Sequence, residues 1–155
     1  MRWLVILALV ACSKSDDKPA ETKVEKPHHH EDRHDPAQAP ALALAVTTGG
    51  ATTTWGADRF AVVPKLAGAA SDGEARDTWS LRELVHAHVG ATARVTAVKS
   101  ADATRAISEA EWNDAARTPI LHTTRRGTLK FRWADKDGAW GETVLKDVTG
   151  LDVAN

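Results

Sequence analysis

Apolar residues recur in short runs along the C-terminal two-thirds of the chain, and this pattern predicts a sheet of short strands. We expect strands at residues 59–63, 93–99, 119–124 and 128–133, and one or two more within residues 143–153. In the fourth of these, Leu129, Phe131 and Trp133 share one face, because side chains alternate across a strand. Turn residues at 125–127 join the third and fourth strands into a hairpin.

A first short helix is predicted by the residues at its start. Ser80 and Glu83 have the spacing of a capping box, in which serine and glutamate side chains satisfy free backbone N–H groups. Trp79 before the cap and Leu84 after it are placed to pack together as a hydrophobic staple. We therefore expect a helix that begins after Ser80 and stops at Gly90.

A second short helix is predicted by the same combination of signals. Ser108 and Glu111 form the capping box, and Ile107 and Trp112 form the staple. Pro119 bounds this helix downstream. The strands and helices together predict an α+β fold, a small mixed sheet with two short capped helices, for a single domain at residues 46–155.

The first twelve residues have the order of an export signal. Met1 and Arg2 precede an apolar run at residues 3–10 that is too short to span a membrane but suits the core of a signal peptide. The sequence Leu9-Val10-Ala11-Cys12 resembles the lipobox of bacterial lipoproteins. The alternative is a buried N-terminal segment with an incidental cysteine.

The lipobox resemblance implies cleavage between Ala11 and Cys12, after a signal peptide at residues 1–11. Cys12 would then carry a diacylglycerol on its thiol and an acyl chain such as palmitate on its amino group, and several chains together anchor firmly. The expected product is an exported lipoprotein in the cell envelope, bound to a membrane through this anchor. The outer membrane or a periplasm-facing surface fits this product better than the cytoplasm.

The segment at residues 12–45 differs from the rest of the chain, because its part at residues 13–40 is polar, rich in charges and proline, and nearly free of bulky apolar side chains. Such a segment cannot bury enough surface to offset its ordering entropy, so we predict a disordered tether behind the lipidated cysteine. Within it, His28, His29, His30 and His34 form a histidine-rich tract. Such a tract could bind Zn(II) or Cu(II) weakly, or it could be a solvated spacer without a cofactor.

The charge of the whole chain is balanced, with a formal net charge of −1. This balance argues against nucleic-acid binding, which normally requires a basic excess. Positive charge nevertheless gathers at one place, because Arg125, Arg126, Lys130 and Arg132 lie at the tip and outer face of the predicted hairpin. These residues could contact anionic lipid headgroups or a protein partner, or they could form an ordinary solvated face.

Several segments of the domain resemble the sulfite-oxidase-like molybdopterin-binding domain. The resemblance is carried, in order, by Trp79 to Val85 (WSLRELV), Val95 to Asp102 (VTAVKSAD), Ile107 to Trp112 (ISEAEW), Ile120 to Trp133 (ILHTTRRGTLKFRW) and Val148 to Val153 (VTGLDV). It implies a related scaffold over residues 58–153. In that family a cysteine thiolate of the domain coordinates molybdenum, but the only cysteine here is Cys12, so the resemblance implies a scaffold that has lost the cofactor.

Five tryptophans lie beyond the signal sequence, and in an envelope protein they could fill the core or stack on sugars. They are Trp55, Trp79, Trp112, Trp133 and Trp140. Since Trp79 and Trp112 are predicted staples and Trp133 shares a face with apolar residues, we expect a role in the core.

We find no catalytic motif and expect the protein not to be an enzyme. His86 and His88 lie two positions apart on the first predicted helix, so their rings point to nearly opposite sides and cannot share a metal. The leading hypothesis is a non-enzymatic envelope lipoprotein whose domain binds a protein or an envelope component. The alternatives are a metal-binding or metal-buffering lipoprotein and a degenerate molybdopterin-binding-like domain.

Overall fold

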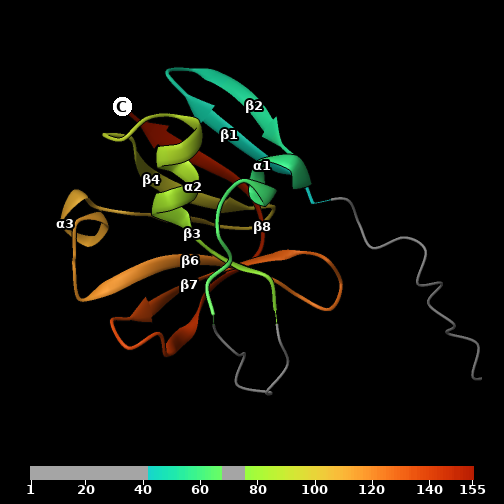
Figure 1. The fold of residues 1–155 in the computed structure, drawn as a ribbon. Coiled ribbons are helices and arrows are strands. Elements are labelled where there is room, and N and C mark those ends of the chain that lie inside the picture. Colours follow the sequence, from blue (N-terminus) through green and yellow to red (C-terminus); the bar gives the residue numbers. More distant parts are fainter. Residues whose placement is uncertain (1–41, 68–75) are drawn as a thin grey trace, which may run out of the picture. The chain divides into compact units, whose positions relative to one another are not determined.

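The computed structural model describes residues 42–67 and 76–155 (Figure 1). The predicted signal peptide, the lipidation site Cys12 and all four histidines of the tract lie outside the described residues. The elements, in chain order, are β1 (Leu44–Thr48), β2 (Ala51–Trp55), α1 (Ala57–Ala61), β3 (Thr78–Ser80), α2 (Leu81–His88), β4 (Arg94–Ser100), β5 (Thr104–Ala106), α3 (Glu109–Trp112), β6 (Arg117–Thr123), β7 (Leu129–Asp135) and β8 (Trp140–Ala154).

All the described strands join one mixed sheet, in which β1 and β8 run parallel and the other pairs run antiparallel. The main path runs β2-β1-β8-β7-β6-β3, and β4 pairs with both β5 and β8. The predicted class is thus confirmed at the level of a mixed, strand-rich sheet with few helices. The predicted number of helices is wrong, because the described residues contain three.

Strand β8 connects two parts of the sheet. Its first half pairs with β7, whereas its last residues lie between β1 on one side and β4 on the other. Gly150 lies where the pairing of β8 with β1 begins, and a Cβ atom there would stand 3.3 Å from the backbone oxygen of Ala45. The glycine therefore permits close packing of β1 against β8.

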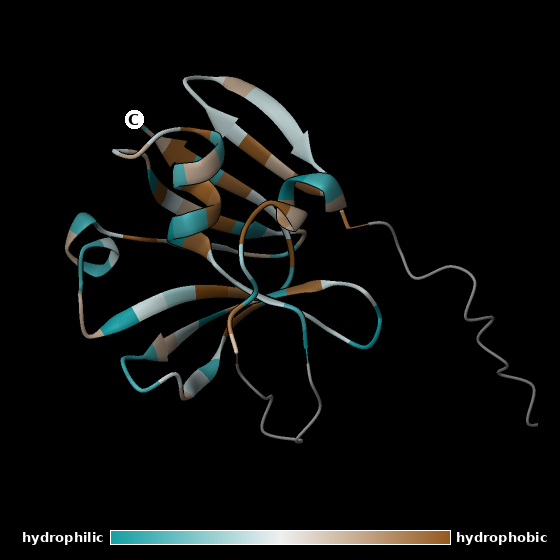
Figure 2. Cartoon of the chain, viewed as in Figure 1, coloured by the Kyte–Doolittle hydropathy of each residue, from teal (hydrophilic) through white to brown (hydrophobic). Residues whose placement is uncertain are grey.

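Helix α2 lies on the sheet and begins at the residue that the sequence indicates. The Ser80 hydroxyl accepts a hydrogen bond from the Glu83 N–H at 3.3 Å, but the reciprocal bond from the Glu83 side chain is not formed. Its apolar residues Leu81, Leu84 and Val85 are fully buried, whereas the outer side of the helix is hydrophilic (Figure 2). Helix stability here comes mainly from packing an amphipathic face, as is usual for helices of this length.

Helix α3 is a single turn held at both ends by polar groups. Ser108 and Glu111 form the complete capping box. From α2, the Arg82 guanidinium donates through Nε and Nη2 to the backbone oxygen of Trp112, and through Nη2 to that of Asp114. Arg82 thereby satisfies carbonyl groups that the end of α3 leaves without helical partners.

The segment 59–63, which we predicted as a strand, belongs mostly to helix α1. Its buried apolar residues are Phe60 and Val63, while Val62 is 67% exposed. Burial at a spacing of three residues suits a helical turn, whereas a strand would bury Phe60 and Val62 together. The prediction was wrong because a run of apolar residues this short does not distinguish a strand from a helix by its period.

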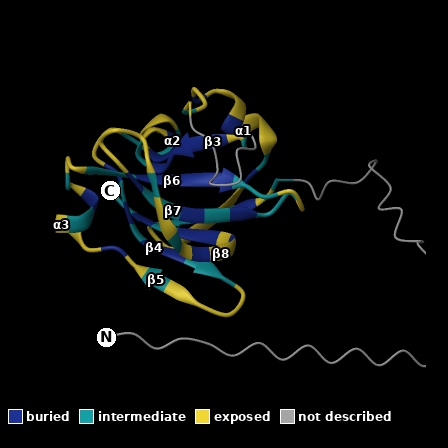
Figure 3. Ribbon diagram, turned by 90° about the horizontal axis from the view of Figure 1, so that it is seen from below, coloured by how far each residue is buried: buried dark blue, intermediate teal, exposed yellow. Residues whose placement is uncertain are grey.

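The domain also begins earlier than predicted. Strand β1 starts at Leu44, which is fully buried, so the boundary placed at residue 46 cuts through a core strand. The β1–β2 hairpin and the edge strand β5, which is largely exposed where β6 is largely buried (Figure 3), were not predicted. No helix within residues 42–67 and 76–155 is long and apolar enough to cross a membrane.

Candidate functional site

The loop between β6 and β7 is a tight turn fixed by Thr124. Its backbone N–H donates to the Thr128 carbonyl at 2.8 Å, and its Oγ1 accepts from the N–H groups of Arg126 and Thr128, each at 3.2 Å. Gly127 completes the turn with a φ of 76°, a conformation that glycine adopts without strain. This turn confirms the predicted hairpin and presents Arg125 and Arg126 at its tip.

A β-bulge in β8 brings two further charged residues to the same place. Along β7 the pairing advances two residues, from Leu129 to Phe131, while along β8 it advances three, from Val148 to Leu145. The extra residue lets both Leu145 and Val148 point inward, so Lys146 and Asp147 both point outward. Bulges commonly redirect side chains in this way.

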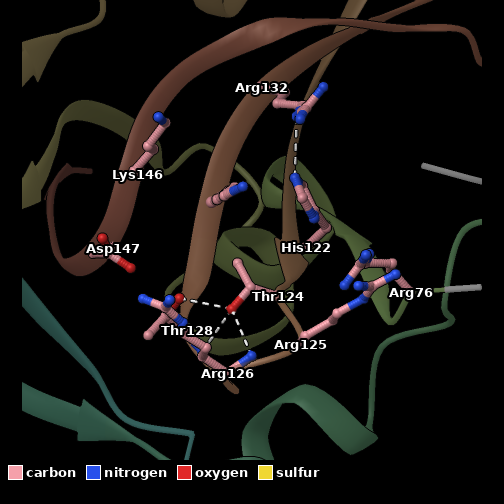
Figure 4. Close-up of a pocket in the computed structure, with 10 residues that line it drawn as sticks. Arg76, His122, Thr124, Arg125, Arg126, Thr128, Arg132, Lys146 and Asp147 are labelled. Atoms are coloured by element: carbon pink, nitrogen blue, oxygen red, sulfur yellow. Dashed lines mark hydrogen bonds between the residues drawn. The ribbon is translucent and has the colours of Figure 1, made fainter. Parts of the chain in front are cut away.

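These side chains surround a pocket of about 470 Å³ on the outer face of β6, β7 and β8 (Figure 4). Its lining contains six basic residues and one acidic residue, together with a histidine and two threonines. They are Arg76, Arg125, Arg126, Lys130, Arg132, Lys146, Asp147, His122, Thr124 and Thr128. The four basic residues that the sequence grouped as an anionic contact therefore do lie together, but in a pocket rather than on a flat face.

His122 and Arg132 form a fixed pair at the side of this pocket. His122 is 3% exposed, and its Nε2 accepts a hydrogen bond from Arg132 Nε at 3.1 Å, while its Nδ1 donates to the Thr123 carbonyl at 3.1 Å. These two bonds require a neutral imidazole with its proton on Nδ1. Arg132 also donates to the Gly141 carbonyl at 3.0 Å and lies over the ring of Trp140.

The neutral state of His122 agrees with its surroundings. Burial lowers the pKa of His122 below its ordinary value, and the positive charges of Arg132, Lys130 and Arg76 lower it further, against the opposing effect of the hydrogen bond to Thr123. Arg132 is thus held in one orientation by a partner that does not neutralise its charge. Its remaining guanidinium N–H groups are available to a ligand.

Much of the positive charge in the pocket has no internal counterion. The side chains of Arg126, Lys130 and Lys146 form no ion pair with any residue that the structure describes. Elsewhere in the domain Lys99 pairs with Asp152 at 2.7 Å, and Arg105 pairs with Glu111 at 2.5 Å. The pocket is therefore a region of uncompensated positive charge in a chain whose net charge is close to zero.

The sequence signals missed part of this site. Arg76, Lys146 and Asp147 come from segments outside the hairpin, and His122, although it lies on β6 of the same hairpin, was also not predicted as part of the site. Arg76 and His122 carry no local signal, since only the pairing of β3 with β6 brings their segments together. The spacing of Leu145 and Val148, three residues apart in a predicted strand, was a usable signal for the bulge.

Among the described residues, the tryptophans and histidines outside the pocket that the sequence singles out do not form a second site. Trp79 and Trp112 are 3% and 4% exposed, which confirms that both lie in the core. His88 packs against the Trp55 ring and lies 2.7 Å through its Nε2 from the Arg59 carbonyl oxygen, whereas His86 is exposed. In the described part of the chain, no three His, Cys, Asp or Glu side chains are grouped so that they could hold a metal ion.

The chain matches no family model, no curated protein and no solved structure.

Proposed function

We propose that this protein is a non-enzymatic lipoprotein of the cell envelope, anchored through Cys12, whose domain binds a phosphate-bearing envelope component in the basic pocket. The observation that supports this function is the uncompensated charge of Arg126, Lys130 and Lys146. The lipobox-like sequence Leu9-Val10-Ala11-Cys12 supports the anchor and the address.

The chemistry of the pocket suits phosphate better than an apolar or neutral ligand. Guanidinium groups present planar sets of N–H donors that match phosphate oxygens, and ammonium groups add mobile point charges. A volume of about 470 Å³ is large enough for a phosphate ester with a small substituent. Arg132, already oriented by His122, would lose little conformational freedom on binding.

The binding test uses the full-length chain in a non-ionic detergent and a soluble phosphate ester, ethyl phosphate, followed by calorimetry at low ionic strength. The double variant Arg126→Ala/Lys130→Ala should weaken binding at least about tenfold, because each charge-assisted hydrogen bond contributes roughly 1.5–3 kcal/mol. Arg94→Ala/Lys136→Ala removes the same charge outside the pocket and should change the affinity less than about twofold. Equal losses in both variants would show that only net charge matters.

The anchor is tested separately. Cys12→Ser should abolish labelling with a radioactive fatty acid and move the protein from the membrane fraction to the soluble fraction. Unchanged partitioning of this variant would contradict the proposed anchor without affecting the proposed ligand.

A second candidate function is favoured by the position of the pocket. It lies on the β6–β7 hairpin, within the segment that resembles the molybdopterin-binding domain, so the phosphate could belong to a pterin. The residues present do not fit the metal of that cofactor, because the chain's only cysteine is Cys12, outside the domain. Acid extraction of the purified protein, followed by fluorescence of oxidised pterins, tests this function.

A further inference from the structure

Asp147 is the acidic residue in the lining of the basic pocket, and its side chain has no polar partner among the described residues. Its carboxylate forms no hydrogen bond or ion pair with any described residue. Lys146 precedes it on the same bulge, and Arg76 and Arg125 lie across the pocket from it (Figure 4). Because this carboxylate lies among cations without pairing with them, its oxygens can accept hydrogen bonds from a ligand.

The backbone holds Asp147 in this position at some cost in stability. Its φ is 50°, in the left-handed region, and it is the only non-glycine residue with a positive φ among the described residues. Aspartate tolerates this conformation better than most residues, but glycine adopts it without strain. The bulge would form more easily with glycine, so the side chain at this position calls for a functional explanation.

The carboxylate changes which anions the pocket should prefer. For a phosphate without a positive group, Asp147 repels the ligand and offsets part of the attraction of the lysines and arginines. For a phosphate that carries an ammonium group, the carboxylate accepts a charge-assisted hydrogen bond from that group. A single acid among several cations therefore discriminates against simple anions and favours a ligand with charges of both signs.

We infer that the pocket selects a phosphate ester bearing a primary ammonium group, with the phosphate held by the basic side chains and the ammonium by Asp147. This inference rests on the proposed function and specifies its ligand. The same chemistry occurs in a lipid headgroup of the ethanolamine type and in soluble phosphoethanolamine.

The test compares two probes of nearly equal size, O-phosphoethanolamine and ethyl phosphate, by calorimetry on the full-length chain in non-ionic detergent. They differ by the ammonium group, so the cations alone would favour ethyl phosphate, which has the greater net negative charge. We expect the parent chain to bind O-phosphoethanolamine about five- to tenfold more tightly, less than a fully buried charge-assisted hydrogen bond would give, because Asp147 is exposed to solvent. Asp147→Asn should reverse the preference by weakening this probe and strengthening ethyl phosphate.

The variant Asp147→Gly distinguishes the effect of the carboxylate from the effect of the backbone conformation. Glycine relieves the positive φ, whereas asparagine leaves it nearly unchanged, and both remove the charge. Matching reversals in the two variants would assign the preference to the carboxylate. A parent chain that binds ethyl phosphate at least as tightly as O-phosphoethanolamine, or an Asp147→Asn variant that keeps the preference, would overturn the inference but leave the proposed function standing. Failure of both probes to bind would overturn both.

Glycerophosphoethanolamine distinguishes the two sources of the ligand. It has the phosphodiester of a lipid headgroup without the acyl chains, whereas O-phosphoethanolamine is a monoester. Binding of the diester within about threefold of the monoester assigns the ligand to a headgroup, since the pocket then tolerates the second ester bond. Binding of the monoester alone assigns it to the soluble compound.

Discussion

Arginine side chains in two regions of this domain differ in whether their guanidinium groups have partners within the fold. Between α2 and α3, the Arg82 guanidinium binds the backbone oxygens of Trp112 and Asp114 and lies over the Trp112 ring. In the basic pocket, Arg126 is exposed and its side chain has no partner among the described residues. The first region uses its donors to hold the fold together, while the second leaves them available for a ligand.

This difference predicts that stability and ligand binding can be changed separately. Substitutions around α2 and α3 should lower the free energy of unfolding without a specific effect on phosphate. Substitutions of the basic residues in the pocket should weaken phosphate binding with little effect on the free energy of unfolding.

Trp79→Ala should produce the largest loss of stability. The indole is 3% exposed and packs edge-to-face on Phe60 with ring centroids 4.8 Å apart. Truncating a buried large aromatic side chain costs about 3–5 kcal/mol, a large part of the roughly 5–15 kcal/mol expected for a whole domain. Denaturant unfolding measures this loss.

Trp79→Phe refines the same test. The Trp79 Nε1–H is buried and has no hydrogen-bond partner among the described residues, so phenylalanine removes an unsatisfied donor while keeping most of the apolar surface. The phenylalanine variant should lose clearly less free energy of unfolding than the alanine variant. A Trp79→Ala variant that unfolds like the parent would contradict the core position of this side chain.

Arg82→Ala should lower the free energy of unfolding by about 2–3 kcal/mol, because charge-assisted hydrogen bonds to partly buried backbone carbonyls and packing on Trp112 are lost together. Arg126→Ala should change it by less than about 0.5 kcal/mol, as is usual for an exposed residue without a partner. The affinity for ethyl phosphate should respond in the reverse order. Similar stability losses in both variants would remove the proposed distinction between the two regions.

His122 should make the pocket side of the domain sensitive to acid. Its pKa in the folded domain is lowered by burial below its ordinary 6.5, so the unfolded chain binds more protons between these two values. The free energy of unfolding should therefore fall as the pH decreases from 6.5 toward the lowered pKa of His122. Below that pKa the loss due to His122 should be complete. Protonated Nε2 also can no longer accept from Arg132.

A pH series of denaturant melts measures this loss, with His122→Gln as the matched variant. Glutamine does not titrate in this range, so the difference between parent and variant isolates His122 from His86 and His88. A difference that stays constant from pH 8 to pH 5 would show that His122 does not have a lowered pKa.

Local sequence signals account for the parts of the fold that depend on neighbouring residues. The caps at Ser80 and Ser108 and the hairpin at 125–127 are set by contacts within a few positions, and they appear where the sequence places them. Helix α1 was misread, because Phe60 and Val63 show a helical spacing only once their burial is known. The basic residues of the hairpin were recognised from one segment, while the rest of the pocket depends on strand pairing.

Asp147→Gly should raise the free energy of unfolding slightly, whereas the substitutions of Trp79 and Arg82 should lower it. Glycine relieves the φ of 50° and removes the carboxylate, but it also adds conformational freedom to the unfolded chain, so the net change should be below about 1 kcal/mol. Asp147→Asn keeps the left-handed tolerance and should unfold close to the parent. Denaturant melts of both variants, set beside their affinities for O-phosphoethanolamine, would then show a residue whose removal stabilises the fold and impairs selection of the ligand. A loss of stability in Asp147→Gly would instead mean that the carboxylate supports the bulge, and the pocket would then resemble the region around Arg82.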